Sequence, residues 1–357
     1  MNPLDNPKTF DRYDGSRMRD SIAVLADQCR EAWDASRCIA IPAAYRKGID
    51  QVVVAGMGGS AIGAHSIASA FAGKLRVPFS VVSGYALPHS VTRRSVVFLS
   101  SYSGTTEETI AAAKEAITRR VRAIGITTGG ALADFLRRKG LPLYQFNPKS
   151  NPCGQPRMGL GYSLFGQLGI LVRLGVLAFT PSAFADAMHM IISEQRRYAP
   201  EVAERTNPAK RLAGFLHGGL PVLFGPDILL GALHIFANQL NENGKTFSAF
   251  FALPELNHHL IEGFRFPVAA HALSRYVFFE SRAAHARIQK RSRITETIVA
   301  KNGIGLTRQE LSGATPFASA LALLVLGSYA SFYCAMLSRI DPSGIPWVNY
   351  LKKKLAR

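Results

Sequence analysis

The sequence predicts an α/β protein built from two doubly wound parallel-sheet domains in tandem. Its 357 residues are more than one compact core usually holds. Short apolar, β-branched runs alternate with helical stretches, which is typical of parallel strands joined by helices, and this alternation starts a second time near residue 220. We therefore expect a first domain over 1–178 and a second over 179–357.

The first half begins with a helical region near residues 18–35, and the alternation follows from residue 48 to about 126. The expected strands cover residues 51–55, 79–82, 96–99 and 141–146, and the expected helices begin near Ala64 and Glu107. Right-handed crossovers bring the carboxyl ends of parallel strands to one edge, where open α/β sheets bind ligands. The loops after these strands are therefore the first candidates for a site.

The second half repeats this order after a helix over about 160–177 and a helical stretch from Thr180-Pro181 to Tyr198. The expected strands lie at 220–225, 246–251 and 276–280, with a helix at 228–241. Gly225-Pro226-Asp227 stands where the first half has a serine-rich loop. We infer a duplicated fold whose second copy lost phosphate binding and supplies catalytic groups.

One loop of the first half combines hydroxyl groups with a helix start. After the apolar run 96–99 come Ser101, Ser103, Gly104, Thr105 and Thr106, and a helical stretch begins at Glu107. Unpaired N–H groups and the helix dipole favour an anion at such a start. Simple N-capping by Ser103, Thr105 or Thr106 would explain the same residues.

A second loop, Gly56 to Gly63, follows the strand at 51–55. An ATP-type P-loop needs Lys-Ser or Lys-Thr after its last glycine, but Ala64-His65 follows here. A dinucleotide loop fits Gly56, Gly58 and Ala61, yet the next strand ends without the carboxylate that would bind the ribose. The third interpretation of this segment is a loop that binds a sugar phosphate.

The two loops together resemble the sugar isomerase (SIS) family, in particular its bifunctional phosphoglucose/phosphomannose isomerase branch. The resemblance rests on residues 53–63 and 101–109 and continues through 151–157, 239–245 and 254–259. Thr105 departs from the asparagine expected there. The resemblance implies two SIS-type domains and a substrate phosphate bound by Gly58, Gly59, Ser60, Ser101, Ser103 and Thr106.

Aldose–ketose isomerisation moves a proton between C1 and C2, so it needs a base, a group that opens the sugar ring, and a group that stabilises an enediolate. The resemblance implies Glu242 as the base, His258 with Lys352 for ring opening, and Arg157 beside the enediolate. The substrates would be glucose 6-phosphate or mannose 6-phosphate and fructose 6-phosphate. It further implies a homodimer in which His258 reaches the partner's site, and no cofactor.

Two departures from the family pattern affect these assignments. His259-Leu260 follows the histidine where the family usually has Asn-Glu, and residues 340–345 follow the family pattern only loosely. Leu351-Lys352 keeps the expected pair, but the adjacent Lys353 or Lys354 could take the place of Lys352. Each residue also has a structural interpretation: Glu242 as a surface carboxylate at a helix end, His258 as a structural histidine, Lys352 as part of a solvated tail. Arg157 could simply pair with an interior carboxylate.

Two alternative functions remain open at this stage. A sugar-phosphate sensor would bind ligand without turnover and would have no need of Glu242. An isomerase of another phosphosugar would use the same loops.

The net charge of +18, from 42 basic and 24 acidic residues, predicts an anionic partner. The basic residues are scattered apart from clusters at 282–293 and 352–357, and no nucleic-acid-binding motif is apparent, so we expect no nucleic acid. The four cysteines lack CxxC spacing and the start of the chain is polar, which favours the reducing cytoplasm.

A metal site is not indicated, because His258 and His259 are neighbours and no HExxH motif occurs. Residues 317–337 carry no charge and are long enough to cross a bilayer. Serines and a glycine dilute this segment, and a buried interface helix needs the same composition. We therefore expect a buried helix and no membrane partner.

Overall fold

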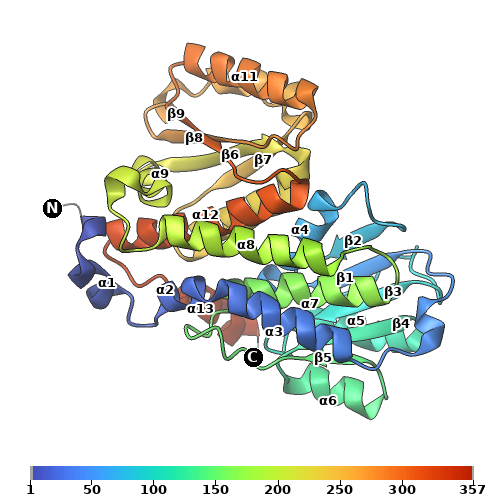
Figure 1. Ribbon diagram of the computed structural model, residues 1–357. Helices are drawn as coiled ribbons and strands as arrows, with labels where there is room; N and C mark the ends of the chain where they lie inside the picture. Colours follow the sequence, from blue (N-terminus) through green and yellow to red (C-terminus); the bar gives the residue numbers. More distant parts are fainter. Residues whose placement is uncertain (1–2, 356–357) are drawn as a thin grey trace.

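The computed structural model of the protein describes residues 3–355 and contains two parallel β-sheets (Figure 1). The five-stranded sheet has the order β2-β1-β3-β4-β5, and the four-stranded sheet, in the upper part of Figure 1, has the order β7-β6-β8-β9. The prediction of two parallel-sheet α/β domains in tandem is confirmed. We propose that the boundary between the two domains lies near residue 178, between the helices α7 (Leu160–Arg173) and α8 (Pro181–Tyr198). The last two residues of the basic cluster 352–357 lie outside the described part of the chain.

The strands of the first sheet lie where the apolar runs predicted them. They are β1 (Val52–Gly56), β2 (Phe79–Val82), β3 (Val96–Ser100), β4 (Arg122–Thr127) and β5 (Leu143–Gln145). All neighbouring strands are parallel, and Gly56 lies opposite Ser100 in the pairing of β1 with β3. The glycine loop and the hydroxyl loop therefore leave the same edge of the sheet side by side.

The helices of the first half cover both faces of this sheet. They are α1 (Pro7–Tyr13), α2 (Met18–Ala23), α3 (Leu25–Cys38), α4 (Ile62–Ala70), α5 (Glu107–Thr118), α6 (Gly130–Arg138) and α7 (Leu160–Arg173). Val52, Val54 and Phe98 pack with α4 and α7, whereas Val53 and Val97 pack with α5 and α6. Burial on both faces explains why these strands read as continuous apolar runs.

The second half repeats the strand order of the first. Its strands are β6 (Leu220–Pro226), β7 (Ala249–Leu253), β8 (Ser274–Glu280) and β9 (Leu306–Glu310). Its helices are α8 (Pro181–Tyr198), α9 (Pro208–Leu216), α10 (Leu230–Glu242), α11 (Ala286–Lys301), α12 (Pro316–Leu337) and α13 (Pro346–Leu355). The order β7-β6-β8-β9 matches β2-β1-β3-β4, as a duplicated fold requires. The elements α9, α11 and β9 were not predicted, and the strand expected at 246–251 begins only at Ala249.

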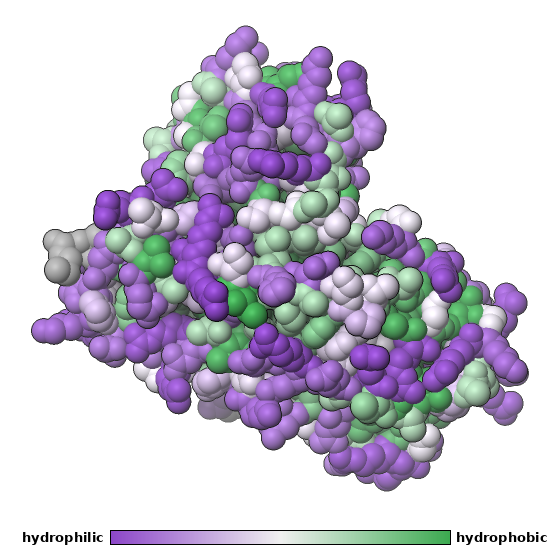
Figure 2. Space-filling model, in the orientation of Figure 1, coloured by the Kyte–Doolittle hydropathy of each residue, from purple (hydrophilic) through white to green (hydrophobic). Residues whose placement is uncertain are grey.

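Helix α12 is the apolar segment of 317–337. By length and composition this helix could cross a membrane, because its most apolar 18-residue stretch has a mean hydropathy of 1.8. However, 94% of that stretch is buried inside the protein. Figure 1 shows it crossing the middle of the molecule, and its side chains join one core with those of α8, α9 and α10. The predicted buried helix is confirmed. On the face drawn in Figure 2, hydrophilic side chains are spread over both parts of the molecule.

Candidate active site

Hydrogen bonds through Ser60 join the two predicted phosphate loops. The Ser60 hydroxyl oxygen accepts from the backbone N–H of Tyr102 at 2.8 Å, and the Ser100 hydroxyl donates to the Ser60 carbonyl at 2.7 Å. Ser60 is buried at the end of a short helical turn, η3 (Gly58–Ser60), directly before α4. The loops after β1 and β3 therefore form one rigid unit.

The start of α5 has no side-chain cap. Thr106 is the N-cap residue, but its hydroxyl pairs with that of Ser101 at 2.8 Å and does not bond to the first N–H groups of the helix. The interpretation of Thr106 as a simple capping residue is therefore wrong. Since nothing from the side chains satisfies these N–H groups, they can donate to a bound anion.

The structure brings all six predicted phosphate-binding residues to this edge. Ser101 is buried and Thr106 is half-buried, whereas Ser103 is exposed and shares a hydrogen bond of 2.9 Å with Thr105. Gly58 is exposed, with a left-handed φ of 47° that glycine adopts without strain. A phosphate at this edge would contact exposed backbone and hydroxyl groups. The buried, hydrogen-bonded serines beneath them hold the two loops in place.

Arg157 lies next to this unit, buried in the short turn η4 (Pro156–Met158). A guanidinium has five N–H donors, and here all five are used. The acceptors are Asn243 Oδ1 (2.6 Å), Gln155 Oε1 (2.9 Å), Glu242 Oε2 (3.3 Å) and the carbonyl oxygens of Pro342 (2.9 Å) and Ser343 (3.1 Å). Burial lowers the pKa of Arg157, and the negative charge of Glu242 opposes this shift.

Glu242 is the last residue of α10, and its side chain is 35% exposed. It forms an ion pair with Arg157, whose side chain is only 4% exposed. The sequence also allowed Arg157 to pair with a carboxylate and Glu242 to be a surface carboxylate at a helix end. Both interpretations describe the same ion pair, because the partner of Arg157 is the carboxylate at the end of α10. The carboxylate is held on one side by a buried cation and remains accessible on the other.

Gly59 couples the glycine loop to the turn that carries Arg157. A Cβ atom at Gly59 would lie 2.8 Å from the backbone nitrogen of Arg157 and 2.8 Å from the carbonyl carbon of Pro156. We expect Gly59→Ala to reduce turnover of a sugar phosphate about 100-fold, because displacing catalytic groups by about 1 Å has this effect. Steady-state kinetics measure it.

Gly73→Ala is the matched control, since a Cβ there meets nothing within 4 Å. Equal activity of the two variants would contradict the coupling of the glycine loop to Arg157.

Asn243 and Lys245, for which no role was predicted, complete this network. Asn243 is fully buried and, besides accepting from Arg157, donates to the Ser331 hydroxyl of α12 at 3.2 Å. Lys245 Nζ donates to the carbonyl oxygens of Glu242, Pro342 and Gly344. Both residues stand in the segment 239–245 that carries the resemblance, but their partners near residue 342 could not be read from sequence.

His258 lies far from Glu242 within this chain. It ends the short turn η7 (Glu255–His258), which follows the carboxyl end of β7, whereas Glu242 precedes the amino end of β7. His258 is exposed, and its neighbour His259 pairs with Glu255 at 2.5 Å. The two predicted catalytic residues therefore lie at opposite ends of strand β7.

Lys352 lies on α13, which follows directly after the turn that contacts Arg157 and Lys245. Every residue of α13 is exposed, and Trp347 is 82% exposed. The adjacent Lys354 lies over the ring of Tyr350 at 5.6 Å. The fold brings the start of α13 to the Glu242 region, but among residues 3–355 the Lys352 ammonium forms no hydrogen bond or ion pair.

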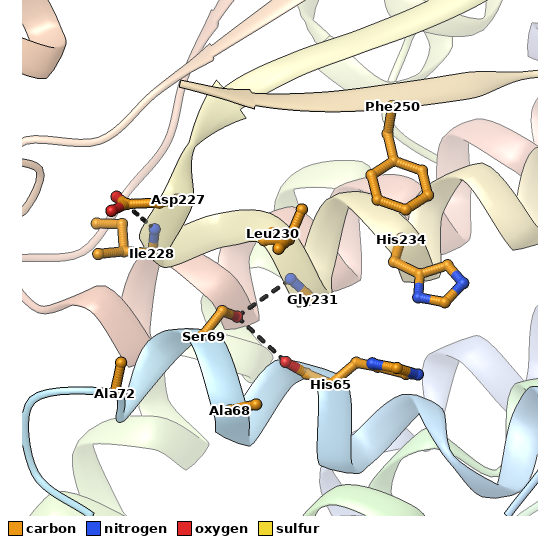
Figure 3. Close-up of a pocket in the computed structure, with 10 residues that line it drawn as sticks. All are labelled: His65, Ala68, Ser69, Ala72, Asp227, Ile228, Leu230, Gly231, His234 and Phe250. Carbon is orange, nitrogen blue, oxygen red and sulfur yellow. Dashed lines mark hydrogen bonds between the residues drawn. The ribbon is translucent and has the colours of Figure 1, made fainter. Parts of the chain in front are cut away.

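A groove of about 350 Å³ between α4 and α10 contains none of the predicted site residues (Figure 3). The rings of His65 and His234 lie 4.7 Å apart in it, and Phe250 stacks on His234 at 5.0 Å. Burial, and then the nearby His234, lower the pKa of His65 to about 4. Within residues 3–355, no group of three or more His, Cys, Asp or Glu residues could hold a metal ion.

Comparisons with known proteins agree with this architecture. Residues 47–134 match the SIS domain, and residues 205–355 match the bacterial phospho-glucose isomerase C-terminal SIS domain. Among solved structures, a hypothetical protein of Thermus thermophilus superposes with a TM-score of 0.75 at 16% identity, covering 98% of this chain and 92% of that one. This likeness shows the fold, and the two sheets are of the SIS type.

Curated relatives extend the match over almost the whole chain. The bifunctional phosphoglucose/phosphomannose isomerase of Caldicellulosiruptor bescii is 33% identical and covers 95% of this chain and 99% of its own length. The enzyme of the same name from Aquifex aeolicus is 28% identical over 86% of this chain and 90% of its own. By its sequence and by both of its domains, this chain belongs to the bifunctional phosphoglucose/phosphomannose isomerase family.

Proposed function

We propose that the protein interconverts glucose 6-phosphate or mannose 6-phosphate with fructose 6-phosphate through a cis-enediolate. The observation that carries the proposal is the accessible carboxylate of Glu242, held at the buried Arg157 beside two linked phosphate loops. A sensor would not require a carboxylate in this position.

The residues divide the chemistry as follows. The start of α5 and the hydroxyls of its loop bind the phosphate and so fix C1 and C2 near Glu242. Starting from fructose 6-phosphate, Glu242 removes a proton from C1, the hydroxyl proton on O1 passes to O2, and Glu242 returns its proton to C2. The charge of Arg157 stabilises the enediolate. His258 and Lys352 assist ring opening.

The proposal includes a homodimer with a shared site. Within one chain Glu242 and His258 lie at opposite ends of strand β7, because Glu242 precedes the strand and His258 follows it. Helix α13 also leaves apolar side chains uncovered, with Tyr350, Leu351 and Leu355 each more than half exposed. A second copy that covers this helix and brings His258 of the partner subunit to Glu242 explains both observations. The four free cysteines fit a cytoplasmic location.

Conversion of fructose 6-phosphate by the purified protein tests the function. We expect both glucose 6-phosphate and mannose 6-phosphate to form without added metal or cofactor, and chromatography of the products quantifies each separately. Binding without turnover would establish the sensor instead. Turnover of a different phosphosugar alone would assign the loops to another substrate.

A further inference from the structure

Lys245 occupies a backbone conformation that lysine rarely adopts. Its φ is 52°, in the left-handed region where glycine and asparagine are favoured and other side chains are disfavoured. Residues held in this conformation are enriched at active sites and ligand clamps. The side chain of Lys245 therefore requires an explanation.

The ammonium of Lys245 joins two segments that are distant in sequence. Lys245 lies at the surface, but its Nζ turns onto the carbonyl oxygens of Glu242, Pro342 (3.1 Å) and Gly344, so all three N–H donors are used. Glu242 ends α10, and Pro342 and Gly344 belong to the turn before α13. One cation thus holds the end of α10 against the turn that leads to α13.

Lys245 and Arg157 share an acceptor, which closes the network. The Pro342 carbonyl accepts from Lys245 Nζ at 3.1 Å and from Arg157 Nη2 at 2.9 Å. Glu242 is held by Arg157 through its carboxylate and by Lys245 through its main chain. The orientation of the carboxylate therefore depends on both cations.

We propose that Lys245 is a positioning residue for the isomerisation, which fixes the main chain of Glu242 so that the carboxylate stays aligned for proton transfer. This inference rests on the proposed function. Lys245 itself does not touch the reacting atoms.

The protonation of Lys245 sets a pH limit on this arrangement. Partial burial of its ammonium and the positive charge of Arg157 lower the pKa of Lys245 to about 8, against the opposing charges of Glu242 and Asp341. These groups face it from η4, from the end of α10 and from the segment after α12. A neutral amine has only two N–H donors and turns a lone pair toward a carbonyl. Turnover should be full below pH 8 and fall as the pH rises through about 8.

Three variants test the role of Lys245 in the conversion of fructose 6-phosphate. We expect Lys245→Asn to lower kcat about 10- to 100-fold with KM changed less than about threefold, because the phosphate loops stay intact. Lys245→Arg keeps a cation that does not titrate in this range, so it should restore part of kcat and lose the fall near pH 8. Arg120→Asn is the matched control, since Arg120 is exposed at a φ of 55° away from this network.

Asparagine suits the left-handed conformation, so Lys245→Asn should still fold, and a cooperative thermal transition checks this. Wild-type kcat in this variant, or an unchanged alkaline fall in Lys245→Arg, would overturn the positioning role. The Lys245→Arg profile decides the question alone if the asparagine variant unfolds. Absence of turnover in the wild-type protein would overturn the proposed function, and the positioning role with it.

Discussion

Glu242→Gln is expected to reduce the conversion of fructose 6-phosphate by about 10²- to 10⁴-fold, the range that general base catalysis contributes. The amide keeps the shape of the side chain and can still accept from Arg157, but it cannot accept the C1 proton. Binding should survive, because the residues proposed to bind the phosphate lie in loops of the first sheet and not on α10. Steady-state kinetics and calorimetric titration with fructose 6-phosphate separate these two effects.

Glu201→Gln serves as the control for the loss of one carboxylate, because Glu201 is exposed and lies outside the Arg157 network. It should retain wild-type kcat. A Glu242→Gln variant that isomerises at more than about a tenth of the wild-type rate would refute the assignment of Glu242 as the base. The function would then require another proton acceptor at this edge.

Mixing two inactive variants should restore activity if each site uses Glu242 from one subunit and His258 from the other. Glu242→Gln and His258→Ala, unfolded together and refolded, give about half mixed dimers, and each mixed dimer contains one site with both residues intact. We expect about a quarter of the wild-type activity, far above either parent. The measurement is kcat per site after refolding at equal concentrations.

The negative control is a mixture of Glu242→Gln with Arg157→Lys. These two side chains contact each other within one chain, so no mixed dimer regains a complete site. No recovery in the mixture with His258→Ala would show that His258 acts within its own subunit or has no role. Recovery in the control mixture would contradict the placement of Arg157 beside Glu242.

The elements that the sequence predicted well share one property. Strands β1 and β3 are short apolar runs that are buried along their whole length, and helix α12 is apolar throughout, so burial alone predicts them. Strand β9 was missed because it is an edge strand with a polar, half-exposed sequence, Leu306–Glu310. Helix α11 was missed because its first half was interpreted as a basic cluster and the helical spacing of its apolar residues was overlooked. Helix α9 did carry a signal, the capping Asn207 followed by Pro208.

The candidate site divides in the same way. The glycine and hydroxyl loops could be predicted because each lies within a few residues of its own strand and helix, and parallel pairing places them at one edge. The contact of Arg157 with Glu242 joins residues 85 positions apart, and the contact with Ser343 spans 186 positions. No local pattern encodes such distances, since they follow from how the two halves pack.

Short stretches of sequence were enough to predict the two parallel sheets, the edge proposed for phosphate binding and, through the family resemblance, the residues proposed for catalysis, because strand, loop and helix signals are local. Only the folded chain shows that the guanidinium of Arg157 is saturated, that Lys245 contacts the main chain of Glu242, and that His258 lies at the other end of β7 from Glu242. These depend on long-range packing, in which buried donors must find acceptors wherever the fold places them.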